Sequence, residues 1–148
     1  MRLTRHARVR DLPDADPWPA WVPATARRRV DPLTRLACAA VEGLLAAGAP
    51  LNAQTAVVVA TSYGSIEATL RFIASVRDFG DAGASPTPFT ASVHNACAGA
   101  LGELLGLRGA VTTISQGGTA TLAALRWAGL VLAAARAPAV LLLSLIHI

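Results

Sequence analysis

Apolar residues recur at helical spacing over one early stretch of the chain. From Leu33 to Leu45, leucine, alanine and valine return every three or four positions, which predicts a helix with one buried face. Asp31 and Pro32 suit its N-cap and first helical position, and Gly48 suits the residue after its end. Similar spacing predicts further helices from Ile66 to Val76, from about Ser92 to Leu105, and from the glycines at 117–118 to about Ala135.

Three short apolar runs lack helical spacing and also lack alternation with polar residues. They are Thr55–Ala60, Ala110–Ser115 and Pro138–Leu143, and they predict strands buried on both faces. Residues 78–90 are expected to form a loop. The order helix, strand, helix, helix, strand, helix, strand predicts an α/β fold with a mainly parallel sheet covered by helices on both faces.

The ends of the chain differ from this ordered middle. Residues 1–30 are expected to be an irregular lead-in arm, because closely spaced prolines prevent a regular helix or a central strand. The arm carries Trp18 and Trp21, which suggest packing on a surface, either its own core or a partner. Residues 31–143 form the predicted domain. Residues 144–148 are a doubtful tail, expected to come from a truncated reading frame.

Charge and cysteine content exclude several classes of protein. All 13 basic residues are arginine, and eight of them precede residue 37. The other five are balanced by five acidic residues, so the rest of the chain is electrically neutral. A neutral body argues against a nucleic-acid-binding fold. Cys38 and Cys97 are too few for a disulfide framework or a tetrahedral metal site. Arg126 and Arg136 interrupt the most apolar stretch, so we expect no membrane span and a cytoplasmic protein without metal or cofactor.

The segment VTTISQGGTATLAAL, residues 111–125, predicts a strand, a sharp turn and a helix. Such a turn pushes its apex residue out of the sheet, and the N–H groups of the following helix point at it. An acyl-transferring enzyme would place serine or cysteine at this apex, but here the turn holds Gly117, Gly118 and Thr119. From the residues alone, an ordinary βα turn is the alternative.

Four collinear segments resemble the N-terminal half of a β-ketoacyl synthase, which has the thiolase-like fold. They are RRRVDPLTRLACAAVEGLL, VVVATSYGSIEATLRFI, SPTPFTASVHNACAGALGELLGLRG and GLRGAVTTISQGGTATLAAL, and the resemblance runs from Arg28 to Leu143. The chain looks most like the chain length factors of bacterial aryl-polyene and related polyketide pathways. In the SVHN-A-AG run, His94, Asn95 and Gly99 match family positions for which we expect structural roles.

The resemblance places the active cysteine of a working synthase at Gly118, so the condensation nucleophile is missing. Cys97 lies on the preceding predicted helix and, like Cys38, is expected to be a buried small residue. Gln116 is reminiscent of partners that carry glutamine in place of cysteine, but it is out of register in this alignment. The two basic residues that working synthases use lie in their C-terminal half.

The resemblance implies a non-elongating chain length factor in fatty-acid or polyketide synthesis, paired with an active β-ketoacyl synthase subunit or with itself. Its interface would use the predicted strand Val111, Thr112, Thr113, Ile114 and Ser115, and its arginines would face an acidic acyl carrier protein. One alternative is residual thioester hydrolysis or decarboxylation at Gly117–Thr119, so enzymatic activity stays open. Others are a fragment of a full-length synthase, or a basic module that binds nucleic acid or membrane through Arg2–Arg10 and Arg27–Arg29.

Overall fold

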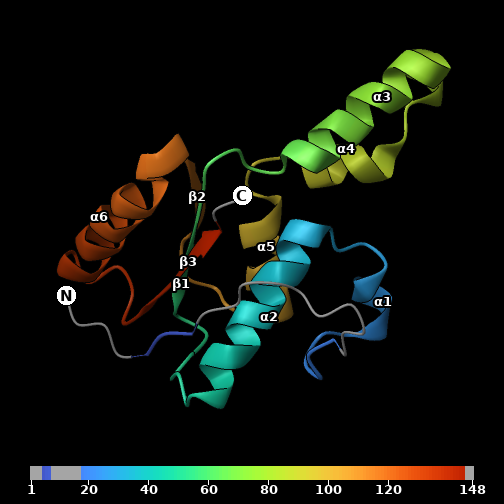
Figure 1. Ribbon diagram of the computed structural model, residues 1–148. Coiled ribbons are helices and arrows are strands. Elements are labelled where there is room, and N and C mark those ends of the chain that lie inside the picture. The colour runs from blue at the N-terminus through green and yellow to red at the C-terminus, as the bar shows by residue number, and fades with distance from the viewer. Residues whose placement is uncertain (1–4, 8–17, 146–148) are drawn as a thin grey trace.

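A three-stranded parallel sheet forms the centre of the computed structural model, which describes residues 5–7 and 18–145 (Figure 1). The strands are β1 (Ala56–Thr61), β2 (Val111–Ser115) and β3 (Val140–Leu145), in the order β2-β1-β3. Val57 of β1 pairs with Val111 on one side and with Leu141 on the other. The predicted parallel α/β architecture is therefore confirmed.

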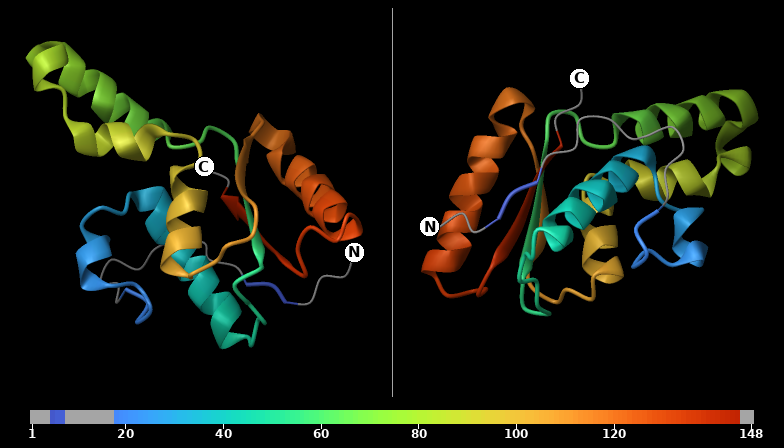
Figure 2. Two further views of the ribbon diagram at one scale, coloured as in Figure 1. Left: turned by 180° about the vertical axis from the view of Figure 1, so that it is seen from behind. Right: turned by 60° about the horizontal axis from the view of Figure 1, so that its bottom comes forward.

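Helices cover both faces of this sheet. Helices α2 (Pro32–Ala46) and α5 (Ala96–Leu104) lie on one face, and α6 (Ala120–Ala133) lies on the other (Figure 2). Every residue of β1 is buried, as expected for a central strand sandwiched between helix layers. Val57 and Val59 belong to the core on the α2 and α5 side. Val58 and Ala60 pack with α6.

Helix α2 begins as the sequence predicts. The Asp31 carboxylate accepts a hydrogen bond from the backbone N–H of Thr34 at 2.9 Å, and Pro32 occupies the first helical position. The carboxylate satisfies one of the N–H groups that a helix leaves free at its start.

The lead-in contains one helical turn that the sequence analysis missed, α1 (Ala24–Arg27). Pro23 precedes it at the N-cap, where a missing N–H costs nothing. Trp18 and Trp21 pack against the chain's own core, which decides between the two surfaces considered above. The Trp21 indole N–H also donates to the Glu42 carboxylate at 2.7 Å. Residues 8–17 lie outside the described part.

Helices α3 (Ile66–Gly83) and α4 (Pro86–Ser92) pack against each other and project from the body, forming what we call the α3–α4 arm (Figure 1). The prediction of a loop at residues 78–90 is therefore wrong. Gly80, with φ of 70°, interrupts α3 without ending it, and Pro86 starts α4. The helix predicted to start near Ser92 starts instead at Ala96, because α4 ends at Ser92 and Val93 is extended.

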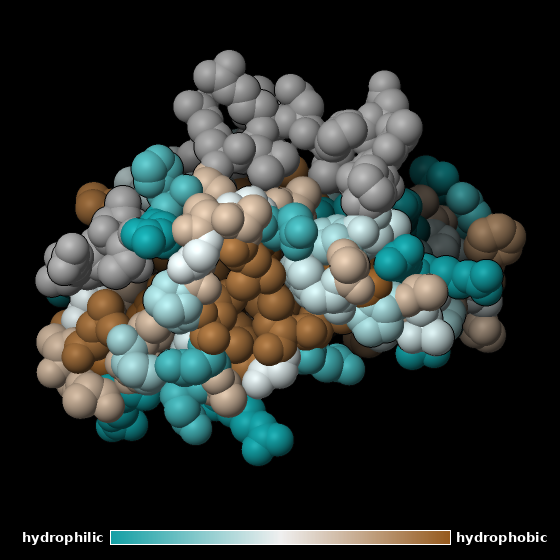
Figure 3. Space-filling view, turned by 90° about the horizontal axis from the view of Figure 1, so that it is seen from below, coloured by the Kyte–Doolittle hydropathy of each residue, from teal (hydrophilic) through white to brown (hydrophobic). Residues whose placement is uncertain are grey.

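One face of the protein exposes apolar side chains. Seen from below, apolar side chains gather in the middle of one face with polar side chains around them (Figure 3). Within the described ranges, no helix combines the length and apolarity that crossing a membrane requires.

Candidate functional site

The neighbouring strands β1 and β2 end side by side, but the helices that follow them cover opposite faces of the sheet. After β1 the chain enters the α3–α4 arm and then α5 on one face, whereas after β2 it enters α6 on the opposite face. In parallel sheets this reversal opens a crevice at the carboxyl ends of the strands, where ligands usually bind. The predicted turn at Gly117–Thr119 lies at this place.

The turn after β2 is as sharp as predicted. Gly117 has a φ of 51°, in the left-handed region that favours glycine, and Gly117–Thr119 form a single 3-10 turn before α6. The backbone N–H of Thr119 closes the turn on the Gln116 carbonyl at 3.2 Å. Gly118 is exposed, and a Cβ built on it would meet nothing within 4 Å. Position 118 therefore has room for a side chain.

The end of β1 and the loop 62–65 that follows it lie against the Gly117–Thr119 turn. The Ser62 hydroxyl donates to the Gly117 carbonyl at 3.4 Å, and Thr61 Oγ1 accepts from the backbone N–H of Gly64 at 3.1 Å. The buried Ser65 hydroxyl is the one buried side-chain polar group of the described residues without a hydrogen-bond partner. The sequence carries a signal for this place, because small polar residues directly follow a buried strand.

The family-motif residues His94 and Asn95 reach the same region. The His94 ring lies so close to Gly64 that a Cβ on Gly64 would be 3.1 Å from His94 Cδ2. Asn95 stands at the N-cap of α5, and its side-chain oxygen accepts a hydrogen bond from the Thr113 hydroxyl at 3.2 Å. Gly99 lies one turn further along α5, and its N–H donates to the Asn95 carbonyl at 2.9 Å.

Strand β2 lies at an edge of the sheet. It pairs with β1 on one side, and no described strand pairs with its other side. The side chains of Val111, Thr112, Thr113 and Ile114 are half-buried, and Ser115 is exposed. This edge can therefore accept a further strand.

Both cysteines lie in the core where α2 packs against α5, as predicted. Burial raises the pKa of the Cys97 thiol to about 12 and that of Cys38 to about 11, so both thiols stay protonated at neutral pH. Neither lies at the turn. Among the residues that the structure covers, no group of three histidine, cysteine or acidic side chains could hold a metal ion.

The solved structures that resemble the chain include two ketosynthase systems. The structure described as the ishigamide ketosynthase/chain length factor is 29% identical, with a TM-score of 0.66, and the match covers 74% of this chain and 32% of that one. A ketosynthase (ApeO) in complex with its chain length factor (ApeC), from Xenorhabdus doucetiae, is 23% identical, with a TM-score of 0.67 and coverage of 90% and 54%. The second likeness supports the fold alone. The chain spans about a third and about half of these two structures.

A search of curated proteins gave no match. The family model described as the β-ketoacyl synthase N-terminal domain matches residues 4–145, almost the whole chain. The parallel sheet, the sharp turn after β2 and this match agree, and the chain belongs to the β-ketoacyl synthase N-terminal domain family.

Proposed function

We propose that the chain acts as a chain length factor, a non-elongating partner of an active ketosynthase in polyketide synthesis of the aryl-polyene type. One observation carries the proposal. The strand, turn and helix that would present a nucleophile are intact, yet the apex position holds Gly118, which has no side chain to carry an acyl group.

No other described thiol can take over this role. Cys38 and Cys97 are buried between helices, and their raised pKa values of about 11 and 12 keep the reactive thiolate scarce. A subunit that keeps the fold but lacks the nucleophile is suited to shape a substrate channel for an active partner.

The α3–α4 arm offers a surface for that channel. Ile66, Leu70 and Ile73 follow one another at helical spacing on α3 and are 46%, 58% and 56% exposed. These three residues, the α3 stripe, begin directly after the loop 62–65, which contacts Gly117, so the stripe starts close to the Gly117–Thr119 turn. Side chains of this size, covered by a partner, would form an apolar wall along a growing acyl chain and set its length by their volume.

The open edge of β2 supports the pairing itself. Residues Val111–Ser115 can pair with the equivalent strand of the ketosynthase, which would extend the sheet across the subunit boundary. The proposal includes an acidic acyl carrier protein that meets the arginines at positions 27–29, and a cytoplasmic location. Deleting residues 1–29 would remove carrier-protein binding if these arginines carry it.

The test is co-expression of the full chain with each ketosynthase of its source organism. We expect a stable heterodimer by size-exclusion chromatography with light scattering. Within it, Leu70→Ala should lengthen the acyl products, and Leu70→Trp should shorten them, by mass spectrometry. Leu130→Ala is a matched control, because Leu130 is similarly exposed, at 62%, but lies on α6. Absence of any heterodimer, or unchanged products for both Leu70 variants, would contradict the proposal.

A second candidate is residual chemistry on acyl thioesters without an acyl-enzyme intermediate. The N–H groups at Gly117–Thr119 could stabilise a developing oxyanion, which favours hydrolysis or decarboxylation. Release of free thiol from an acyl thioester by the purified full chain would support this candidate. A chain that is inert alone but needed by its partner would support the chain length factor.

A further inference from the structure

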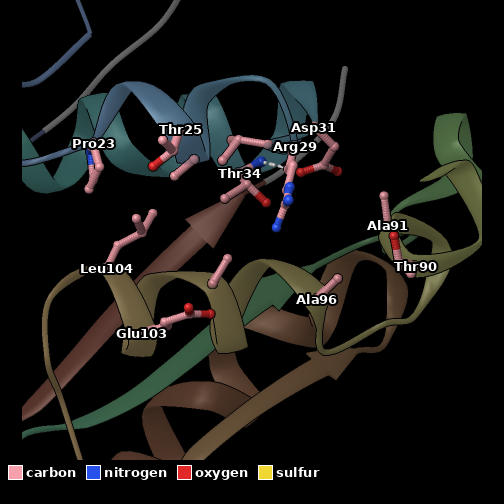
Figure 4. A pocket seen from close by; sticks show the side chains of 13 residues that line it. Pro23, Thr25, Arg29, Asp31, Thr34, Thr90, Ala91, Ala96, Glu103 and Leu104 are labelled. Carbon is pink, nitrogen blue, oxygen red and sulfur yellow. Dashed lines mark hydrogen bonds between the residues drawn. The ribbon is translucent and has the colours of Figure 1, made fainter.

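A cavity lies against α5, and the Gly117–Thr119 turn is not part of its lining. It has a volume of about 570 Å³ and lies between the corner where α1 joins α2, one face of α5, and the end of α4 (Figure 4). Small-molecule sites commonly have volumes of about 300–1,000 Å³. The cavity is therefore large enough for a ligand of several heavy atoms.

Opposite charges line this cavity from facing walls. Arg29 points from the α1–α2 corner toward α5, and Glu103 lies on α5 across the gap (Figure 4). No ion pair joins these two side chains among the interactions of the described residues, and each is solvent-exposed. Asp31 also lines the cavity beside Arg29, and its carboxylate caps α2 by accepting a hydrogen bond from the backbone N–H of Thr34.

The floor of the cavity consists of short side chains. Ala96 and Ala100 occupy successive turns of α5, Ala26 faces them from α1, and Ala91 closes the α4 end. Alanine leaves space next to the backbone without adding competing polar groups. A ligand in this space would meet these alanines, the threonines at positions 25, 34 and 90, the Arg29 guanidinium beside the Asp31 carboxylate on one side, and the Glu103 carboxylate on the other.

We propose that this cavity binds a small zwitterion of the amino-acid or short-peptide type. Its carboxylate would meet the Arg29 guanidinium, which can hold both oxygens at once, and its ammonium group would meet Glu103. Such a ligand satisfies both charges together, whereas a simple anion or cation leaves one of them unpaired. This site is separate from the Gly117–Thr119 turn and does not depend on the proposed function.

Dialanine is the probe, titrated into the full isotope-labelled chain and followed by amide chemical shifts. We expect saturable shifts at Ala96, Ala100 and the α1–α2 corner. Acetylalanine, which keeps only the anion, and alanine amide, which keeps only the cation, should each bind at least about fivefold more weakly. Arg29→Gln and Glu103→Gln should weaken dialanine binding by a similar factor.

The double variant Arg29→Glu with Glu103→Arg should restore binding, since a zwitterion can turn round. Arg28→Gln and Glu67→Gln are matched controls, because each removes one exposed charge outside the cavity. Amide dispersion confirms that each variant is folded. If acetylalanine bound as tightly as dialanine, and if Glu103→Gln did not change acetylalanine binding, the cavity would be a simple anion site. That result would overturn the proposal. Absence of saturable shifts at tens of millimolar dialanine would overturn it as well.

Discussion

The hydroxyl of Thr113 donates a hydrogen bond to the side-chain oxygen of Asn95 at 3.2 Å. The bond joins the middle of the edge strand β2 to the first turn of α5, so it fixes the strand that we propose as the partner interface. Asn95 is also one of the three motif residues, with His94 and Gly99, for which the resemblance implies a structural role. Its hydrogen bond to Thr113 joins a helix to a strand, which is a structural role.

We predict that Asn95→Ala and Thr113→Val are coupled. In a double-mutant cycle, the coupling free energy of unfolding should be about 0.5–1 kcal/mol, the usual size for a partly exposed hydrogen bond. Thr112→Val is the control, because alternate residues of a strand face opposite sides of the sheet. Its effect should add to that of Asn95→Ala without coupling. Denaturant unfolding measures all of these values, and a coupling near zero for Thr113 would contradict the prediction.

The apex assignment predicts a reactive thiol in Gly118→Cys. A Cβ at this position meets nothing within 4 Å, and the residue is exposed, so the thiol should react with iodoacetamide at about pH 8. Cys38 and Cys97 should remain unlabelled over the same time, because both are buried. Peptide mass spectrometry after digestion distinguishes the three. Labelling at the same rate at all three positions would mean that residue 118 is not the exposed apex.

Stability should fall at alkaline pH because of the buried thiols. An unfolded cysteine ionises near 9.0, whereas the folded pKa values are about 11 for Cys38 and about 12 for Cys97. Above pH 9 the folded chain therefore holds more protons than the unfolded chain, and its free energy of unfolding declines as pH rises toward these values. Below pH 9 the thiols contribute no such dependence.

Cys97→Ala tests this dependence. The variant should be less stable at neutral pH, because it loses buried volume, but its stability should decline less steeply between about pH 9 and 10.5. Denaturant unfolding at several pH values gives both quantities. An unchanged slope would show that the thiol of Cys97 does not keep its proton to higher pH in the folded chain.

Two glycines should respond oppositely to alanine. At Gly109, a Cβ would lie 2.5 Å from the Thr55 carbonyl oxygen and 2.8 Å from the Ala56 nitrogen, so the backbone of β1 would have to move. We expect Gly109→Ala to lower the free energy of unfolding by about 2–4 kcal/mol. Gly129 lies within α6 with nothing within 4 Å of a built Cβ, and Gly129→Ala should raise stability by up to about 1 kcal/mol. Equal effects would contradict this reading of both sites.

Local patterns were enough to predict most of the fold. The apolar run of β1 and the Asp31-Pro32 start of α2 each have one strong physical reading, and the structure matches both. Residues 78–90 were predicted as a loop, and not as part of two helices, because glycine and proline usually end helices. Here Gly80 only interrupts α3, and Pro86 begins α4. Contact between Phe72 and Phe89, whose ring centres are 5.2 Å apart, helps hold the two helices together.

The candidate site was only half predictable. The turn at Gly117–Thr119 follows from its own sequence, because a strand, two glycines and an apolar helix succeed one another. Its contact with Ser62 joins residues far apart in the chain, and the cavity between Arg29 and Glu103 joins residues even further apart. Such pairs depend on how the layers stack, which no local spacing reveals.

The central position of β1 also determines when the chain can fold during synthesis. β1 is made first of the three strands, yet its partner residues in β2 follow more than fifty residues later, and those in β3 more than eighty. At about 5–20 residues per second, the ribosome needs roughly 3–10 s to deliver β2 and longer to deliver β3. The most completely buried strand of the folded protein is therefore exposed for seconds on the nascent chain, where a chaperone can bind it.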